Sequence, residues 1–350
     1  MTLAIRHAAI VLLAAALGSC SMFDYSGIVT RRFALVYGVT RYTMAAGNGT
    51  GPNLQFPDSD ASAIYAVLKS NGYAITSRWV DGTGAVWKNN ALTGGFIGSP
   101  NYDINGTFTD GGSGIADAPT RSNIIADVQA LANTMGPNDI VVVYFSGHGT
   151  QDTSVTPSRE YFDPYQSVAY FANAQSPGYY DNPSTSVRDD DLAAAFASIS
   201  TPRKVLVLDT CNSGGFIGNL LEVDWTPPAY LGGASLVGRG TLIQAISNYA
   251  SMQSSPTGLS PYGAQVLSAA GRDESCYESG SPYFHGVMTY YLLQGLQGSQ
   301  ADLNHDGHVT VLEAFSYAKA GIEQNWNPNA PTGYTFEPHV SGGPVDFVLF

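Results

Sequence analysis

Hydrophobic positions along the chain fall into short continuous runs, and stretches with helical spacing lie between them. The runs at 140–145 and 204–208 contain β-branched, leucine and aromatic residues, and each ends at small residues next to a reactive side chain. Continuous apolar runs of this length are typical of strands buried on both faces of a parallel sheet. Similar patterns predict further strands at 32–39, 73–80, 265–270 and 345–350.

Apolar residues at helical spacing predict the helices between these strands. The segment 58–70 begins with carboxylates, which favour a helix N-terminus, and it ends at Asn71-Gly72. Strands that alternate with helices predict an α/β fold, with a mostly parallel sheet of about six strands and helices on both faces. The other helices are predicted at 120–135, 188–199, 285–296 and 311–323.

Three polar segments interrupt this pattern and predict long loop insertions near 81–119, 150–187 and 216–263. The first is dense in glycine, asparagine, threonine and aromatic residues, and the second contains several tyrosines and prolines. No linker-like stretch divides the chain into two complete cores, so residues 32–350 are predicted to form one domain with insertions.

The composition is that of a globular, acidic protein. The chain has 350 residues, of which 44% are hydrophobic, and its formal net charge is -13. A chain of this length can bury a large core. The negative charge repels phosphate backbones, so we expect no nucleic acid partner.

The N-terminus has the pattern of an export signal. Arg6 precedes the apolar stretch 8–17, which is too short to span a bilayer. Leu-Gly-Ser-Cys ending at Cys20 resembles a lipoprotein box, so we expect a signal peptide at 1–19, lipidation of Cys20 and a tether at 20–31. This predicts a lipid anchor in a bacterial outer membrane, facing the periplasm or the exterior, as the chain's contact with the membrane. The alternative is an ordinary signal peptide and a periplasmic protein.

Two reactive side chains follow the two most apolar strands. His148 stands between glycines after one strand, and Cys211 follows Asp-Thr after the other. Alone, the histidine could belong to a structural turn, and the cysteine could be a small buried hydrophobe. Parallel strands deliver their carboxyl ends to one edge of a sheet, where open α/β sheets bind ligands. The two strands together therefore predict a Cys/His pair.

Such a pair suits acyl transfer. A thiol with an ordinary pKa of about 8.5 is mostly protonated at neutral pH, and a neighbouring imidazole that generates or stabilises the thiolate makes it a nucleophile. The backbone N–H groups of Gly149 and Cys211 are candidates to bind the oxyanion of the intermediate. The sequence shows no evident third member of a triad. We expect Cys211 to be a free thiol rather than half of a disulfide with Cys276, to which we assign no catalytic role.

Three motifs together resemble the bacterial caspase-like and metacaspase cysteine peptidases, relatives of caspases and legumain. They are Tyr-Phe-Ser-Gly-His-Gly at 144–149, Asp-Thr-Cys-Asn-Ser-Gly-Gly at 209–215 and Leu-Gln-Phe-Pro-Asp-Ser-Asp-Ala at 54–61. The resemblance extends from residue 32 to about residue 322, with the three insertions outside it. It implies a caspase-hemoglobinase-like three-layer sandwich built on the mostly parallel sheet.

The resemblance also implies roles for individual residues. His148 would be the general base and Cys211 the nucleophile of peptide-bond hydrolysis. Asp60, Ser146 and Asp209 would line the pocket for the first substrate side chain, which would be Arg or Lys because of the two carboxylates.

One departure from the metacaspase pattern affects this pocket. Phe56-Pro57 stands where those enzymes usually have Gly-Cys, which puts the pocket's shape and its basic preference in question. Asp60 could equally be a helix N-terminal carboxylate.

A second motif, at 302–313, fits the twelve-residue calcium loop of an EF-hand. It offers Asp302, Asn304 and Asp306 at the first, third and fifth places, the His308 carbonyl at the seventh and Glu313 at the twelfth. The alternative is a polar turn with a capping carboxylate. Oxygen-rich spacing argues for Ca²⁺ rather than zinc, and we expect no organic cofactor.

These observations favour a cysteine endopeptidase that cuts protein or peptide substrates after Arg or Lys, with calcium dependence as a further expectation. The alternative is a caspase-fold binding or scaffold lipoprotein with little or no proteolytic activity. We expect a monomer.

Overall fold

The computed structural model describes residues 30–42, 53–83, 86–89, 117–152, 159–165, 168–171, 178–181, 186–211, 213–217, 264–341 and 346–350. Arg32–Phe350 forms one unit and Met1–Arg31 another. The expected signal peptide at 1–19, Cys20 and most of the tether at 20–31 lie outside the described residues and stay predictions. In the described part of the chain, no helix is long and apolar enough to cross a membrane.

A seven-stranded sheet forms the centre of the Arg32–Phe350 unit. The strands are β1 (Arg32–Val39), β2 (Ala74–Val80), β3 (Val86–Asn89), β4 (Ile140–Ser146), β10 (Lys204–Asp209), β11 (Ala264–Ser268) and β14 (His339–Val340). They are arranged in the order β14-β11-β10-β4-β1-β2-β3. The five inner strands are parallel, and the two edge strands are antiparallel to their neighbours. This confirms the predicted mostly parallel sheet.

The sheet differs from the predicted one at its edges. β3 lies inside the segment 81–119, which was predicted to be an insertion, and it has no continuous apolar run that could have identified it. The predicted terminal strand at 345–350 forms only an isolated bridge between Thr310 and Val348, and β14 occupies the sheet edge instead. β3 has four residues and β14 has two, and strands this short carry a weak sequence signal.

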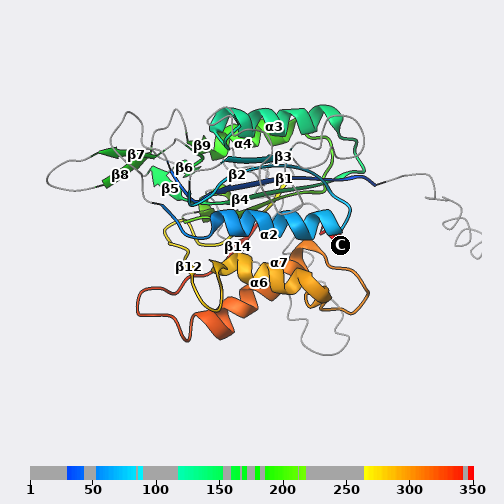
Figure 1. Cartoon of the computed structure of the whole chain (residues 1–350). Coiled ribbons are helices and arrows are strands. Elements are labelled where there is room, and N and C mark those ends of the chain that lie inside the picture. Colours follow the sequence, from blue (N-terminus) through cyan, green and yellow to red (C-terminus); the bar gives the residue numbers. More distant parts are fainter. Residues whose placement is uncertain are drawn as a thin grey trace, which may run out of the picture. The chain divides into compact units, whose positions relative to one another are not determined.

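Helices cover both faces of the sheet (Figure 1). The helices α3 (Arg121–Thr134) and α4 (Asp189–Ala197) lie on one face, and α2 (Pro57–Ser70), α6 (Val287–Leu296) and α7 (Val311–Gly321) lie on the other. Short turns of 3-10 or π helix are η3 (Ser213–Ile217), η5 (Gln297–Ser299) and η6 (Ile322–Trp326). The result is three layers, as the sequence predicted.

The helix ends depart from the predicted ones by a few residues. The predicted helix at 285–296 begins only at Val287, because His285 and Gly286 pair with the preceding chain as a short strand. The predicted helix at 311–323 is α-helical to Gly321 and then continues as η6. Helical spacing of apolar residues cannot show that His285 and Gly286 pair with residues 278 and 279 instead of starting the helix.

The core lies on both sides of the sheet and is organised by β4, whose seven residues are all buried. Val142 and Tyr144 pack with the layer of α2, α6 and α7, whereas Val141, Val143 and Phe145 pack with the layer of α3 and α4. Alternate residues of β4 therefore pack into the cores on opposite faces of the sheet, as expected for a central parallel strand.

Several short strands lie outside the main sheet. They are β5 (Gly149–Asp152), β6 (Arg159–Phe162), β9 (Val187–Arg188), the hairpin of β7 (Val168–Phe171) and β8 (Gly178–Asp181), and the pair β12 (Glu278–Ser279) and β13 (His285–Gly286). The insertion predicted near 150–187 thus contains small antiparallel sheets. Most of the insertions predicted near 81–119 and 216–263 lies outside the described residues.

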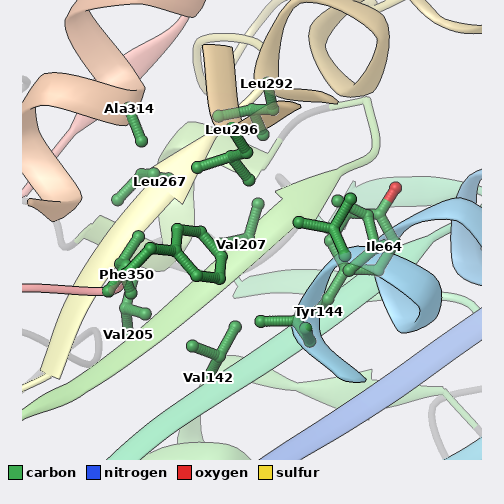
Figure 2. A pocket seen from close by; sticks show the side chains of 13 residues that line it. Ile64, Val142, Tyr144, Val205, Val207, Leu267, Leu292, Leu296, Ala314 and Phe350 are labelled. Carbon is green, nitrogen blue, oxygen red and sulfur yellow. The ribbon is translucent and has the colours of Figure 1, made fainter. Parts of the chain in front are cut away.

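A small apolar cavity of about 40 Å³ lies between the sheet and the layer of α2, α6 and α7 (Figure 2). Val207, Leu267, Leu292 and Ala314 are among the residues that line it. A cavity lined by hydrocarbon stays dry and has no polar group to orient a ligand. It is a packing gap, and the candidate chemistry lies elsewhere.

Candidate active site

The strands β4 and β10 bring the two candidate catalytic residues to the same edge of the sheet. They pair in parallel, with Ser146 beside Asp209. His148 and Cys211 each stand two residues beyond this pair, and both are half-buried. The histidine and the cysteine therefore leave the sheet at matching positions on neighbouring strands.

The backbones of the two strand ends approach each other closely. A β-carbon on Gly149 would overlap the carbonyl oxygen of Cys211, and one on Gly147 would lie 2.6 Å from the Tyr42 hydroxyl. Only glycine allows this approach. The N–H groups of Gly149 and Cys211 thus lie at the predicted site, and their role as oxyanion donors stays a prediction.

Tyr42, to which the sequence analysis gave no role, holds the backbone at His148. Its hydroxyl accepts a hydrogen bond from the His148 N–H at 2.8 Å and donates one to the Asp163 carbonyl at 3.2 Å. The rings of Tyr42 and His148 lie 4.9 Å apart. Burial raises the pKa of Tyr42, so the phenol stays neutral and keeps both hydrogen bonds. Tyr42 and His148 are 106 residues apart in sequence, which is why no local pattern indicates the contact.

Cys276 lies against Cys211. The two sulfur atoms are 3.9 Å apart, and the Cys211 sulfur is 3.6 Å from the Cys276 carbonyl oxygen. Both cysteines are free thiols, as expected. The hydrogen bond with the Cys276 thiol lowers the pKa of Cys211 to about 7, although burial opposes this change. No sequence motif assigns a role to Cys276, which lies next to the candidate nucleophile in the structure.

The three predicted pocket residues come together beneath this edge. The Ser146 hydroxyl donates a hydrogen bond to Asp60 at 2.8 Å. Asp60, in the first turn of α2, is 1% exposed, and Asp209, at the end of β10, is 5% exposed. Burial and the neighbouring carboxyl group of Asp60 raise the pKa of Asp209 to about 7. Burial raises the pKa of Asp60 as well.

Residues of β13 and of the start of α6 contact the two carboxylates of the predicted pocket. The Nδ1 atom of His285 lies 2.8 Å from Asp60, and the Gly286 N–H donates to both oxygens of the same carboxylate at 3.1 and 3.2 Å. The Thr289 N–H and hydroxyl donate to Asp209 at 3.0 and 2.6 Å. A β-carbon on Gly286 would overlap the Asp209 carboxylate. The sequence suggested His285 only as a helix start, because its partner lies 225 residues away.

The architecture and the site are consistent with one known domain family. The family model for the caspase domain matches residues 31–332, which is most of the chain. The chain belongs to the caspase domain family. This confirms the resemblance and the fold class that the sequence motifs implied.

Two curated relatives and one solved structure are among the proteins similar to this chain. Metacaspase-1 of Scheffersomyces stipitis is 32% identical over 109 residues, which are 31% of this caspase-domain chain and 25% of that protein. Metacaspase-1B of Aspergillus terreus is 29% identical over 109 residues, which are 31% of this chain and 26% of that protein. Caspase-1 from Spodoptera frugiperda aligns with a TM-score of 0.46 and 11% identity, over 91% of this chain and 90% of that chain. The matched segments thus span about a quarter of the length of these metacaspases.

The predicted calcium loop of this caspase domain lies between α6 and α7. Gly307, at the sixth place of the loop, has φ of 86°, in the left-handed region that glycine adopts without strain. Glu313 accepts hydrogen bonds from the N–H groups of Asn304 at 3.3 Å and Thr310 at 3.0 Å, so it joins the two ends of the loop. The backbone thus has the sharp turn that a calcium loop requires.

The loop's carboxylates bind its own backbone. Asp302 accepts hydrogen bonds from the N–H groups of Asp306 at 3.1 Å and Gly307 at 2.9 Å, and Asp306 accepts one from His308 at 2.9 Å. Over the described ranges, no three His, Cys, Asp or Glu side chains lie close enough together to hold a metal ion. The loop has the donor types for calcium, and its side chains point to backbone groups.

The C-terminal segment 346–350 pairs with this loop. The Val309 N–H donates to the Phe350 carbonyl at 3.2 Å, and the Leu349 N–H donates to the Val309 carbonyl at 2.8 Å. These hydrogen bonds hold the loop against residues 349 and 350.

The buried carboxyl pair predicts a pH-dependent stability. The pKa of Asp209 is about 7 in the folded protein against an ordinary value of 3.8. Between these values the folded protein keeps a proton that the unfolded chain has lost. This contribution of Asp209 therefore lowers the free energy of unfolding as the pH rises from about 4 to about 7, and is constant outside that range.

Replacing Asp209 by asparagine is expected to flatten this dependence, with a larger gain in Tm near about pH 8 than near about pH 5. Thermal denaturation over this pH range measures the slope. Glu323→Gln is the control, because Glu323 is exposed and its ion pair with Lys319 is loose, at 3.7 Å. Parallel curves for the wild type and Asp209→Asn would contradict the interpretation.

Proposed function

We propose that this caspase-domain protein is a cysteine endopeptidase, in which Cys211 is the nucleophile and His148 the general base. The observation that carries the proposal is the parallel pairing of β4 with β10, which brings both strand ends to one edge. The pKa of Cys211, lowered to about 7 by the hydrogen bond with Cys276, supports it, because a large fraction of thiolate is then present at neutral pH.

The proposed reaction passes through an acyl-enzyme. The Cys211 thiolate attacks the carbonyl carbon of the peptide bond, and the N–H groups of Gly149 and Cys211 stabilise the developing oxyanion. The protonated His148 then gives its proton to the leaving amine, and a thioester remains. His148 next takes a proton from a water molecule, whose attack on the thioester releases the acid product and restores Cys211.

The pocket of Asp60, Ser146 and Asp209 supports a preference for Arg or Lys. Ionising two neighbouring buried carboxyl groups is unfavourable, because each carboxylate loses its hydration and the two repel each other. A cationic substrate side chain offsets this free energy by pairing with them. Asp60 already accepts hydrogen bonds from Ser146, His285 and Gly286. In the part of the chain that the structure describes, the hydrogen bonds to the Asp209 carboxylate come from Thr289. Asp209 thus can accept more additional hydrogen bonds than Asp60 from a guanidinium or ammonium group.

The first test is hydrolysis of short peptide amides with Arg or Lys before the scissile bond. The wild type is expected to cleave them, and Cys211→Ala is expected to be inactive because the nucleophile is missing. His148→Ala is expected to lower kcat by at least about a hundredfold, because the proton transfers lose their carrier. Release of the amine measures the rates.

The control for a fold defect is thermal denaturation of each variant. Equal turnover by the wild type and Cys211→Ala would exclude the proposal. Such a result, together with no labelling of Cys211 by a thiol-reactive peptide probe, would favour the alternative of a binding or scaffold module.

The second test concerns the pocket. Asp209→Asn is expected to reduce kcat/KM for an Arg peptide roughly ten- to hundredfold relative to the same peptide with norleucine, because a charge-assisted hydrogen bond to the substrate is lost. Asp190→Asn is the control, since Asp190 is an exposed carboxylate in the first turn of α4. An unchanged ratio of the two peptides would show that Asp209 does not read the substrate's charge.

We propose in addition that the loop 302–313 binds Ca²⁺. Asp302, Asn304, Asp306 and Glu313 would offer side-chain oxygens and His308 its carbonyl, a donor set that calcium prefers. The turn at Gly307 supports the proposal. Calcium would neutralise neighbouring carboxylates and tie the loop to the start of α7.

Glu313→Gln tests the calcium proposal. Glutamine can keep the capping interaction with Thr310 at the start of α7 while it removes the bidentate carboxylate. The wild type is expected to gain Tm when calcium replaces a chelator, and the variant to bind calcium at least about tenfold more weakly. Calorimetric titration and thermal denaturation measure the two effects, with magnesium as the comparison ion. If neither calcium affinity nor Tm differs between the two proteins, the loop is not a calcium site.

A further inference from the structure

The two cysteines of the described chain stand in different segments that meet at the candidate active site. Cys211 lies in the turn after β10, and Cys276 lies in the loop between β11 and β12. Their sulfur atoms are 3.9 Å apart, and both residues are half-buried free thiols. The peptidase mechanism proposed above uses one of these thiols and leaves the other without a chemical role.

The loop that carries Cys276 is fixed in this place by contacts on both sides of the cysteine. Before it, a β-carbon on Gly214 would lie 2.6 Å from the Arg272 N atom, so the loop backbone lies directly on η3. After it, the carbonyl of Tyr277 accepts a hydrogen bond from Val287 N–H at 2.9 Å, and the Tyr277 hydroxyl donates one to Gly333 at 2.9 Å. The closeness of the two sulfur atoms is therefore built into the packing of the loop.

We propose that Cys276 is a resolving thiol, which forms a reversible disulfide with Cys211 when the protein meets a peroxide. The pair is thus an oxidative modification site within the candidate active site. The consequence for peptide hydrolysis rests on the proposed function, because a Cys211 sulfur held in a disulfide cannot attack a substrate. The disulfide itself does not depend on that function.

The chemistry balances with hydrogen peroxide as the oxidant. The Cys211 thiolate attacks one peroxide oxygen, the O–O bond breaks, and hydroxide leaves, so that Cys211 becomes a sulfenic acid. The Cys276 sulfur then attacks the sulfenic sulfur, an S–S bond forms, the S–O bond breaks, and hydroxide leaves again. The thiol protons convert the hydroxide ions to water. In total, two thiols and one peroxide give one disulfide and two water molecules.

The geometry requires only a small movement. A disulfide has an S–S distance of about 2.05 Å, so the sulfur atoms must approach by roughly 2 Å from their present separation. Rotation of the two cysteine side chains can supply this movement. Both residues are half-buried, and only the Cys211 sulfur has to meet the oxidant.

The electrostatics of the pair fit the order of the two steps. The pKa of Cys211 is lowered to about 7, so this sulfur is the more nucleophilic at neutral pH and is oxidised first. The pKa of Cys276 is raised, chiefly by its hydrogen bond to Cys211 and by burial. Cys276 thus stays a thiol until the neighbouring sulfur becomes electrophilic.

The experiment exposes the reduced full-length protein to hydrogen peroxide and maps the cysteines by mass spectrometry of a non-reducing digest. We expect a peptide pair joined through Cys211 and Cys276, with the loss of two hydrogen atoms, which a dithiol reverses. In Cys276→Ser, which keeps a hydrogen-bond donor beside Cys211, the sulfenic acid cannot be resolved. A sulfenic-acid probe is therefore expected to label Cys211 at least about tenfold more in this variant than in the wild type.

The outcomes separate this inference from the proposed function. A joined peptide in a protein that hydrolyses no peptide would support the disulfide and exclude the peptidase. Active protein that yields no joined peptide, or that pairs Cys211 with Cys20 instead, would overturn the resolving role of Cys276. Equal labelling by the probe in the wild type and in Cys276→Ser would overturn it as well.

Discussion

The candidate site depends on the register between β4 and β10, and the burial of both faces of these strands fixes that register. Successive residues of β4 enter different cores: Val142 and Tyr144 pack with the layer of α2, α6 and α7, while Val141 and Val143 pack with the layer of α3 and α4. A slip by one residue would exchange the two sets and place every side chain in the wrong core. Because the core forbids such a slip, Ser146 stays beside Asp209, and the residues that follow them stay together as well.

The same strand ends explain how much could be predicted from sequence. A buried parallel strand and the residues after it form a local pattern, so the sheet and the placement of His148 and Cys211 at one of its edges could be predicted. The pocket residues Asp60, Ser146 and Asp209 were instead implied by the resemblance to caspase-like and metacaspase peptidases. The contacts of His285 with Asp60 and of Cys276 with Cys211 join residues 225 and 65 positions apart. They are set by the path of loops whose sequences have no regular period, and no pattern of residues could indicate them. The edge strand β3 was not predicted, because a short strand of mixed polarity resembles a loop in sequence.

Asp60 and Asp209 are buried, and hydrogen bonds from the surrounding chain only partly offset the loss of their hydration. Asp60 benefits from its place in the first turn of α2 and from three donors, yet burial still raises its pKa. Gly286 lies between the two carboxylates, and its lack of a β-carbon lets them come so close. A site that holds buried acids beside each other is unfavourable when they are both ionised, and its most favourable guest is a cation. The unfavourable burial of two neighbouring carboxyl groups is thus also the basis of the preference for Arg or Lys that we propose.

Helix α6 connects this pocket with the loop at 302–313. Near its start it presents Thr289 to Asp209, and near its end it packs closely on α7. A β-carbon on Gly321 would overlap the Tyr291 ring, and one on Gly295 would lie 2.8 Å from the Tyr317 ring. The loop at 302–313, for which we propose calcium binding, lies at the far end of α6 from Asp209 and at the start of α7. An ion bound there would not contact the substrate and could act on Asp209 only through the packing of α6 on α7. Its first effect would be on the stability of that packing. Stability is therefore the property of this protein that calcium should affect most directly, and any effect on peptide hydrolysis would follow from it.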